Sequence, residues 1–406
     1  MYNKYKHQHF KEYFKLSKYL LLLFLTYSTI LISQNKVIVG AERPELYLNT
    51  LLGKRVGLVA NQTSKVKKEH LVDVLLNEGV NVVKVFSPEH GFRGKSDAGE
   101  KVKDEIDLQT GLPIYSLYGK SKRKPSKEIL KDIDIIVFDL QDVGVRFYTY
   151  ISSLHYVMEA CAENNVQLIV LDRPNPNGFY VDGPILDLKF RSFVGMHPVP
   201  VVHGMTIGEY AKMINGEKWL NNMIQCSLEI IPCLNYNHNT RYVLPIPPSP
   251  NLPNMRSVYL YPSLCFFEGT NISIGRGTNF PFQVFGAPYF SKNEFSFTPK
   301  STYGSKNPKY KSLICNGKDL RTISIDSLKN TKKLNLNWLV NSYKISNESE
   351  DFFNKNNFFI LLSGTDKLMN LVKGGATPKH IYETYQNELN NFKSLRKHYL
   401  MYDDFE

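Results

Sequence analysis

The sequence predicts an α/β fold built on a parallel sheet, followed by a smaller α+β region. Between about residues 36 and 240, short and nearly all-apolar runs alternate with helical patterns, as expected of strands covered by helices on both faces. From residue 241 onward, prolines and short β-like pieces replace this alternation. We therefore expect a Rossmann-like domain over residues 36–240 and a smaller α+β domain over residues 241–406.

The first region contains four runs with the composition of buried strands: Arg55 to Ala60, Asn81 to Phe86, Ile133 to Phe138 and Gln167 to Leu171. A helical pattern follows the first run and ends near Gly79, where a helix C-cap is expected. A second helix is predicted from about Tyr150. Because neither G-x-G-x-x-G nor a Walker A sequence is present, no bound cofactor is expected.

The second region begins with five prolines between Pro245 and Pro253, which exclude a helix or a central strand there. Its end is more regular. Thr377 and Pro378 form an N-cap followed by proline at the first helical position. Apolar residues then recur every three or four positions, so a C-terminal amphipathic helix is predicted.

Residues 1–33 have the composition of a secretory signal peptide. Five lysines precede a short apolar run, Tyr19 to Ile32, and polar residues follow it. The run is shorter than the roughly 20 residues of a comfortable membrane span, although an uncleaved anchor is the alternative. We expect an exported protein, periplasmic or extracellular, with no stable membrane span after cleavage.

The net charge and the cysteine content narrow the class of function further. The formal net charge is +12, which could attract an anionic substrate or simply reflect a lysine-rich composition. No nucleic-acid motif accompanies the charge, so no nucleic-acid partner is expected. The five cysteines are an odd number and show no C-x-x-C spacing, so no metal site is predicted from them.

Polar residues follow each of the four predicted strands. Because parallel strands end at one edge of a sheet, these residues should meet at a common rim where a ligand binds. The substrate-binding candidates at these exits are Asn61, Gln62, Asp139, Gln141, Asp142, Asp172, Arg173 and Asn175.

Glu89 follows the second strand, between Pro88 and Gly91, on a loop that should present its side chain in a defined place. A carboxyl group there could act as a general acid, with His90 orienting it. The alternative is that Glu89 only caps a turn.

Asp142, Arg146 and His203 are further candidates whose role the sequence leaves open. The carboxylates of Asp139 and Asp142, near Arg146, suit a structural ion-pair network, a Mg²⁺ site or ligands for sugar hydroxyls. His203 and the nearby His197 match no zinc spacing, so a structural or substrate-contact role is favoured for them.

Glu268 and Asn271 follow an apolar run and are interpreted as another strand exit. Arg276 lies between Gly275 and Gly277, where its guanidinium could bind an anion with two hydrogen bonds. A surface charge on a turn is the alternative.

Many of these motifs, in the same order, resemble the exo-β-N-acetylmuramidases, a family formerly listed as of unknown function. The similar segments are Gly57 to Thr63, Ser87 to Gly94, Thr110 to Gly119, Phe138 to Tyr150, Leu171 to Pro176, Val181 to Pro184, His203 to Glu209, Pro248 to Asn251, Phe267 to Thr278 and Arg396 to Tyr402. Two features depart from the family pattern: Ile246, where an aromatic residue is expected, and the Lys- and Ser-rich stretch of residues 291–311.

The resemblance implies a Rossmann-like domain and a smaller C-terminal domain with the active site between them. It also implies hydrolysis of peptidoglycan-derived saccharides that end in N-acetylmuramic acid. Such hydrolysis usually needs two carboxyl groups. We assign Glu89, supported by His90, as general acid and Glu268 as the second carboxylate. In a substrate-assisted reaction, Glu268 would instead orient the 2-acetamido group of the sugar.

The lactyl carboxylate distinguishes muramic acid from glucosamine, and Arg146, Arg173 and Arg276 are candidates to pair with it. Two other classes of function compete with this hypothesis. One is a metal-dependent deacetylase or esterase that uses Asp139, Asp142 and His203. The other is a non-catalytic peptidoglycan-binding protein.

Overall fold

A computed structural model describes residues 36–89, 91–93, 105–119, 123–292 and 295–406. Residues Ile38–Glu406 form one compact unit. The predicted signal peptide, residues 1–33, and His90 lie outside the described residues. The division of the chain between residues 240 and 241 stays a prediction.

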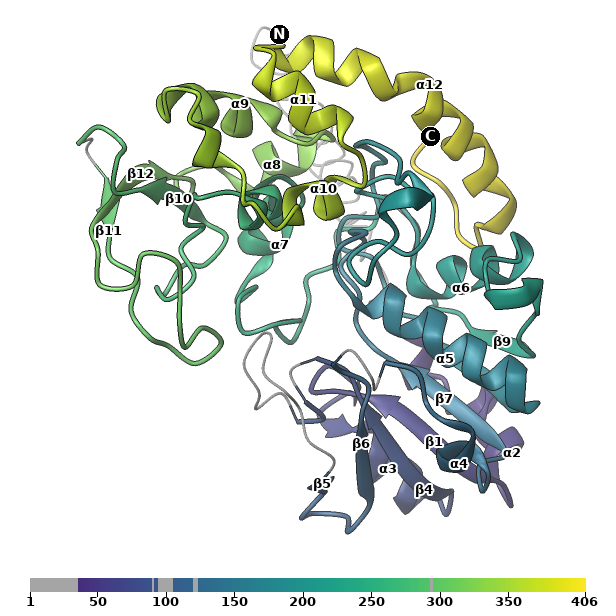
Figure 1. Ribbon diagram of the computed structural model, residues 1–406. Coiled ribbons are helices and arrows are strands. Elements are labelled where there is room, and N and C mark those ends of the chain that lie inside the picture. The colour runs from purple at the N-terminus through teal and green to yellow at the C-terminus, as the bar shows by residue number, and fades with distance from the viewer. Residues whose placement is uncertain (1–35, 90, 94–104, 120–122, 293–294) are drawn as a thin grey trace, which may run out of the picture. The chain divides into compact units, whose positions relative to one another are not determined.

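This unit contains a seven-stranded sheet in the order β5-β6-β4-β1-β7-β8-β9, in the lower part of Figure 1. All neighbouring pairs are parallel except β5 with β6, which is an antiparallel edge. The strands are β5 (Glu105–Ile106), β6 (Pro113–Ser116), β4 (Asn81–Ser87), β1 (Arg55–Ala60), β7 (Ile135–Asp139), β8 (Gln167–Leu171) and β9 (Leu228–Ile231). The predicted α/β class and the four predicted strands are confirmed.

Buried side chains on both faces of the sheet explain why its strands are nearly all apolar. In β7, Ile136 and Phe138 belong to the core on the side of helix α5 (Tyr150–Asn164). The alternate residues Ile135 and Val137 belong to the core on the side of helix α3 (Leu71–Asn77). Successive strand residues point to opposite faces, so each residue of such a strand has to be apolar.

Local signals set the ends of several helices. Gly79 follows α3 with φ +78°, a conformation that favours glycine. Helix α6 (Ile207–Gly216) begins with a capping box in which the side chains of Thr206 and Glu209 each accept a backbone N–H. At the C-terminus, Thr377 caps α12 (Pro378–Arg396), as predicted.

After residue 254 the chain is mainly helical, with a small three-stranded sheet in the order β10-β12-β11. Its elements are α7 (Met255–Leu264), the 3-10 helix η5 (Cys265–Gly269), β10 (Val284–Ala287), β11 (Ser296–Phe297), β12 (Cys315–Asp319), α8 (Ile325–Thr331), α9 (Leu336–Ile345), η6 (Glu350–Phe352), α10 (Phe358–Ser363), α11 (Lys367–Lys373), α12 and η7 (Lys397–Tyr399). The shorter elements that precede them are η1 (Gly40–Glu42), η2 (Pro44–Leu46), α2 (Leu48–Leu51), β2 (Lys65–Val66), β3 (Glu69–His70), α4 (Lys127–Leu130), η3 (Leu188–Phe190) and η4 (Asn221–Met223).

The structure corrects one local expectation: Glu268 does not leave a strand. It lies on η5, which continues directly from α7. A capping box at Asn254 and Ser257 starts α7, and the helix contains Pro262. The apolar run suggested a strand because this helix is buried around most of its circumference and therefore lacks an amphipathic period.

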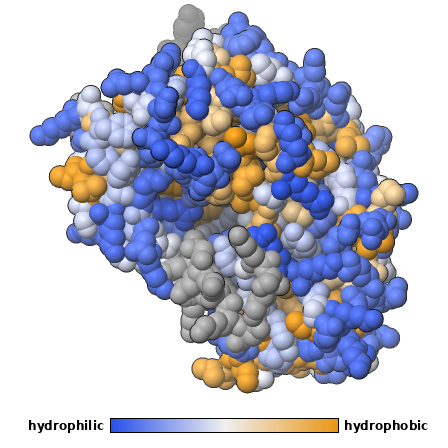
Figure 2. Space-filling model, in the orientation of Figure 1, coloured by the Kyte–Doolittle hydropathy of each residue, from blue (hydrophilic) through white to orange (hydrophobic). Residues whose placement is uncertain are grey.

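The surface is mostly hydrophilic on the face shown in Figure 2, where hydrophobic residues gather over the upper middle. Within the described part of the chain, no helix is both long enough and apolar enough to cross a membrane. All five cysteines are buried and carry free thiols.

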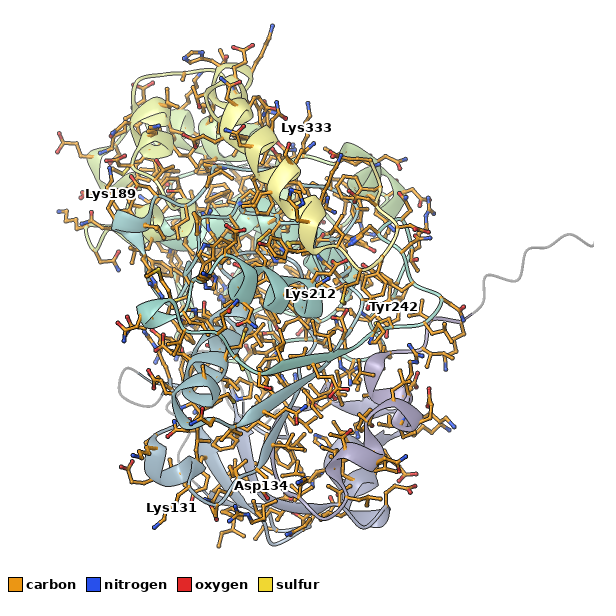
Figure 3. The ribbon with its side chains drawn as sticks, turned by 90° about the vertical axis from the view of Figure 1, so that its right-hand side faces the viewer. Lys131, Asp134, Lys189, Lys212, Tyr242 and Lys333 are labelled. Carbon is orange, nitrogen blue, oxygen red and sulfur yellow. The ribbon has the colours of Figure 1, made fainter. Side chains whose placement is uncertain are left out.

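An exposed ion pair lies at the opposite edge of the sheet from the predicted rim. Arg55, at the start of β1, donates two side-chain hydrogen bonds of 3.1 and 2.7 Å to Asp134, which precedes β7. Asp134 marks this edge at the bottom of Figure 3. The pairing joins the beginnings of two neighbouring parallel strands.

The closing segment of the chain is tied to the sheet by Tyr402. Its hydroxyl donates to Asp172 Oδ2 at 2.6 Å and accepts from the backbone N–H of Cys233 at 2.8 Å. We expect Tyr402→Phe to lower the free energy of unfolding by about 1–3 kcal/mol, because the buried Asp172 carboxyl group and the backbone N–H of Cys233 each lose a hydrogen bond. Urea unfolding measures this, with Tyr399→Phe, whose hydroxyl contacts the less buried Glu217, as the control. Equal losses in both variants would contradict the expectation.

Candidate active site

The polar residues that follow β1, β7 and β8 meet at the carboxyl edge of the sheet, as their parallel arrangement requires. The Ser64 hydroxyl donates to the backbone carbonyl of Asp139 at 2.5 Å. The Thr63 hydroxyl accepts the backbone N–H of Gln141 at 3.2 Å. The Gln141 side chain in turn donates to the carbonyl of Pro174 at 2.8 Å. Hydrogen bonds thus connect three strand exits.

Asn61 and Gln62 leave β1 in different directions. Asn61 is fully buried, and its side chain accepts two hydrogen bonds from Thr63 and donates to the Tyr150 hydroxyl at 2.7 Å. The Gln62 side chain is partly exposed and donates to the carbonyl of Pro248 at 3.3 Å. Asn61 therefore stabilises the turn of residues 61–64, while Gln62 contacts the proline-rich run of residues 245–253.

Asp139 and Arg173 form a buried ion pair. The Nε and Nη2 atoms of Arg173 lie 2.6 and 2.8 Å from the two carboxylate oxygens of Asp139. Burial by itself would lower the pKa of the Arg173 guanidinium. The negative charge of Asp139 and its hydrogen bonds together have the larger effect, so the pKa is raised. The paired geometry satisfies both side chains within the protein.

Asp142 and His203 are also buried, with the Asp142 Oδ2 and His203 Nε2 atoms 4.0 Å apart. Burial raises the pKa of Asp142 to about 7, although hydrogen bonds from the backbone N–H groups of Gly144 and Val143 act to lower it. Burial also lowers the pKa of His203 to about 3, helped by the positive charges of Arg396 and Arg146. Both residues therefore favour their neutral forms at slightly acidic pH.

Asp172 and Asn175 stabilise the loop that follows β8. Asp172 accepts the backbone N–H of Gly208 at 2.8 Å as well as the Tyr402 hydroxyl. Burial raises the pKa of Asp172 to about 6. The Asn175 side chain donates to the carbonyl of Met205 at 2.8 Å. Both residues link the loop after β8 to the segment that begins α6.

Arg146 is completely buried. Its guanidinium donates to the carbonyls of Pro184, Val199 and Leu362 at 2.9, 2.7 and 3.0 Å. Burial lowers the pKa of Arg146 to about 9. These hydrogen bonds connect three segments that lie far apart in the sequence.

The two candidate catalytic carboxyl groups, Glu89 and Glu268, line one cavity of about 810 Å³. Arg276 lines it too, together with the segment of residues 304–309. The structure therefore brings Glu89 together with Glu268 and Arg276, which come from a distant part of the sequence. The other candidates at the strand exits do not line this cavity and have protein partners of their own.

Glu89 is surrounded by hydroxyl groups. Its Oε2 atom lies 3.5 Å from the Thr149 hydroxyl, and its side chain hydrogen-bonds Tyr118. Burial and the negative charge of Glu89 both raise the pKa of Tyr118, so the phenol stays a hydrogen-bond donor. His90, the predicted partner, lies outside the described residues.

Glu268 forms an ion pair with Arg276. The Nε and Nη2 atoms of Arg276 lie 2.7 and 2.5 Å from Glu268 Oε1, and both side chains remain about a quarter exposed. The flanking Gly275 and Gly277 have φ values of +76° and +80°, which an L side chain would strain. The turn therefore depends on both glycines to present the guanidinium to Glu268.

Asn271 lies three residues after Glu268, and its side-chain oxygen accepts the Tyr289 hydroxyl at 2.6 Å. Tyr289 remains 42% exposed, so this pair lies at the surface near the cavity residues Ile272 and Ser273. Asn271 is not itself part of the cavity wall described here.

The proline-rich run connects the sheet with the wall of the cavity. The Tyr148 hydroxyl donates to the carbonyl of Pro248 at 2.8 Å, beside the contact from Gln62. The Asn251 side chain donates to the carbonyl of Gly304, also at 2.8 Å. The segment of residues 304–309 is thereby tied to the carboxyl edge of the sheet.

Sequence reasoning missed Tyr118, Thr149 and Lys309. The first two belong to segments that carry the family resemblance, so their position in those motifs was an available signal. Lys309 lies in the Lys- and Ser-rich stretch, where composition made it indistinguishable from surface lysines. Its contacts were therefore visible only in the structure.

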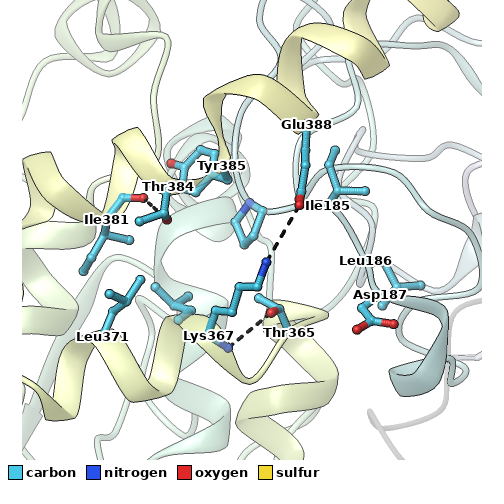
Figure 4. Close-up of a pocket in the computed structure, with 12 residues that line it drawn as sticks. Ile185, Leu186, Asp187, Thr365, Lys367, Leu371, Ile381, Thr384, Tyr385 and Glu388 are labelled. Carbon is cyan, nitrogen blue, oxygen red and sulfur yellow. Dashed lines mark hydrogen bonds and ion pairs between the residues drawn. The ribbon is translucent and has the colours of Figure 1, made fainter.

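A smaller cavity of about 310 Å³ lies between α11, α12 and residues 184–187 (Figure 4). Its carboxylates are Asp187 and Glu388, and Glu388 lies 3.9 Å from Lys367 in an ion pair. It contains none of the candidate site residues. Within the described ranges, no cluster of three or more His, Cys, Asp or Glu side chains could hold a metal ion.

Two carboxyl groups on the wall of one cavity, one of them following a strand of a parallel α/β sheet, are an arrangement found in the glycoside hydrolase class. Comparison with known proteins agrees. The model of the exo-β-N-acetylmuramidase NamZ N-terminal domain matches residues 56–256, and that of its C-terminal domain matches residues 259–402. The chain belongs to the exo-β-N-acetylmuramidase NamZ family, and it is a glycosidase that acts on peptidoglycan.

Individual relatives support this assignment over nearly the whole chain. The peptidoglycan β-N-acetylmuramidase NamZ of Bacillus subtilis is 38% identical over 374 residues, which cover 88% of this chain and 89% of the relative. Two crystal structures of DUF1343 family proteins from Bacteroides fragilis are similar in fold. One has a TM-score of 0.85 at 47% identity and covers 91% of this chain and 100% of its own. The other has a TM-score of 0.77 at 30% identity, with 90% and 99% covered.

The raised pKa of Asp142 predicts a pH-dependent stability. Between its ordinary value of 3.8 and about 7, the folded protein holds a proton that the unfolded chain releases. The free energy of unfolding should therefore fall as pH rises through this window, by up to roughly 4 kcal/mol from this group. Asp142→Asn removes the titration, so urea unfolding from pH 4.5 to 7.5 should give a flatter profile than the parent. Two parallel profiles would contradict the prediction.

Proposed function

We propose that the protein is an exo-acting glycosidase that releases N-acetylmuramic acid from the non-reducing ends of peptidoglycan fragments. The observation that carries the proposal is the presence of Glu89 and Glu268 on the wall of one cavity, with Arg276 beside them. The activity in the printed name of the Bacillus subtilis relative supports it.

In the proposed reaction, Glu89 protonates the leaving oxygen as general acid. The Tyr118 and Thr149 hydroxyls fix the place of its carboxyl group. Glu268 is the second carboxylate, and the ion pair with Arg276 holds it as an acceptor. It serves as base or nucleophile, or it orients the 2-acetamido group in a substrate-assisted reaction.

Arg276 is also the proposed partner of the lactyl carboxylate. Of the three arginines predicted for this role, it is the one that lines the cavity. Arg146 and Arg173 donate to protein carbonyls and to Asp139 instead. The Nε and Nη2 atoms of Arg276 contact Glu268, so Nη1 is the nitrogen assigned to the substrate.

The composition of residues 1–33 supports export, so we propose that the protein acts in the periplasm or outside the cell. Sequencing the N-terminus of protein recovered from the periplasmic and extracellular fractions tests both the cleavage and the location. Recovery of the uncleaved chain from the cytoplasm alone would overturn this part of the proposal.

Two glutamine substitutions separate the roles of the carboxyl groups. On a muramic acid-terminated disaccharide, Glu89→Gln should lower kcat about 10²- to 10⁴-fold, because the sugar leaving group needs a proton. On a nitrophenyl muramide the loss should be much smaller, since nitrophenolate leaves without one. Glu268→Gln should lower the activity on both substrates, because Glu268 acts on the muramic acid unit that both substrates contain. Released muramic acid is identified by mass.

The matched control is Glu383→Gln, an exposed carboxyl group on α12. It should retain parental activity on both substrates. Full activity of Glu89→Gln or Glu268→Gln on the disaccharide would remove that residue from the mechanism. Binding of the disaccharide by the parent protein without any product would favour the non-catalytic alternative.

Arg276→Met should reduce discrimination between substrates. Loss of a charge-assisted hydrogen bond costs about 1.5–3 kcal/mol, so kcat/KM for the muramic acid-terminated disaccharide should fall about 10- to 100-fold relative to its glucosamine-terminated counterpart. The ratio of the two kcat/KM values is the measurement, because a disturbed Glu268 lowers both values together. An unchanged ratio would remove Arg276 from lactyl recognition.

A further inference from the structure

Lys309 lies on the wall of the active-site cavity, yet its ammonium group is directed at the protein backbone. It donates to the carbonyls of Phe267, Ile272 and Thr270, the first two at 3.4 and 3.1 Å. An ammonium has three N–H donors and no acceptor. Its hydrogen-bonding capacity is therefore used within the protein rather than offered to a ligand.

The three carbonyls belong to the short segment that carries Glu268. They lie immediately before this residue and two and four positions after it, where η5 ends and the chain turns. Asn354 holds the same segment from another direction, since its side chain donates to the carbonyl of Glu268 at 3.0 Å. The backbone becomes irregular after Gly269, so these contacts replace the restraint that a longer helix would supply.

Lys309 is also the second positive charge near Glu268, after Arg276. Burial lowers the pKa of Lys309 to about 8, the charge of Arg276 acts in the same direction, and Glu268 opposes both. Glu89 and Lys306 are the other charged residues of the same cavity wall, and Tyr310 is the adjacent titratable group along the chain. Loss of the ammonium proton thus falls within an accessible pH range.

We propose that Lys309 is a positioning residue, which fixes the Glu268 carboxylate in the active site by binding the three backbone carbonyls around it. This inference rests on the proposed role of Glu268 and extends it. Only the charged form can donate to all three carbonyls, because the neutral amine has two N–H groups and a lone pair that faces an acceptor. The position of Glu268 therefore depends on the protonation of a residue that does not touch the reacting atoms.

The first experiment is Lys309→Met. We expect kcat for the disaccharide to fall about 10²-fold with a smaller change in KM, since a slightly misplaced catalytic group has that effect. The matched control is Lys318→Met, an exposed lysine on β12, which should behave as the parent. Thermal unfolding is measured for both variants. Parental kcat in folded Lys309→Met would overturn the proposal.

The second experiment keeps the proposal testable if Lys309→Met folds poorly. In Lys309→Cys, alkylation with 2-bromoethylamine forms a thioether and releases bromide, which rebuilds an ammonium side chain of lysine-like length. The five native cysteines are all buried, so the parent protein treated in the same way is the control for labelling elsewhere. We expect alkylation to restore most of the lost kcat.

The pH profile distinguishes a charged positioning group from a packing role. For the parent, kcat should decline above pH about 8, where Lys309 loses its proton. In the alkylated variant the decline should move to lower pH, because the sulfur atom lowers the pKa of the amine. If kcat of the alkylated variant declines at the same pH as kcat of the parent, the proposal is overturned. Full activity of Glu268→Gln would instead refute the proposed function of that carboxylate, so the two failures are separate.

Discussion

The active site depends on the way in which the carboxyl ends of the parallel strands are fastened to one another. A backbone that leaves a strand has unsatisfied polar groups, and in this protein buried side chains satisfy them across neighbouring strands. The ion pair between Asp139 and Arg173 is one of these links, and it joins the ends of β7 and β8 with two short hydrogen bonds. Removing one partner of such a pair leaves a buried charge, which costs about 3–5 kcal/mol.

This arrangement divides the polar residues of the rim into two groups. Asn61, Asp139, Asp172 and Arg173 are nearly inaccessible and bind other parts of the chain. Glu89 and Gln62 extend beyond them toward the cavity and the proline-rich run. The buried residues thus hold the backbone from which the accessible residues extend, as the proposed catalysis by positioned carboxyl groups requires.

Much of the fold was predictable because its physical signals are local. A strand covered on both faces must be apolar throughout, and β1, β4, β7 and β8 show that composition. The cap at Thr377 was equally readable. The helix α7 was not, because burial around most of its surface removed the helical period and made its end resemble a strand.

The site was predictable only in part for a related reason. Sequence shows that a residue is polar and where it follows a strand, but the depth of burial is a property of the assembled chain. Arg146 and Arg276 are both arginines within family-like motifs, yet one is buried among carbonyls and the other reaches the cavity. Lys309 had no distinguishing neighbour in the sequence, since its partners are backbone atoms about 40 positions away.

The proline-rich run has a consequence for the stiffness of the cavity wall. Proline fixes one backbone dihedral at each of its positions, so the run between Pro245 and Pro253 has few accessible conformations. Two hydrogen bonds hold its middle: the carbonyl of Pro248 accepts the Tyr148 hydroxyl on the side of the sheet, and the Asn251 side chain donates to the carbonyl of Gly304 on the cavity wall. It therefore acts as a stiff link between the sheet and the cavity-wall segment of residues 304–309. A wall held in this way has little conformational entropy to lose when a ligand binds against it.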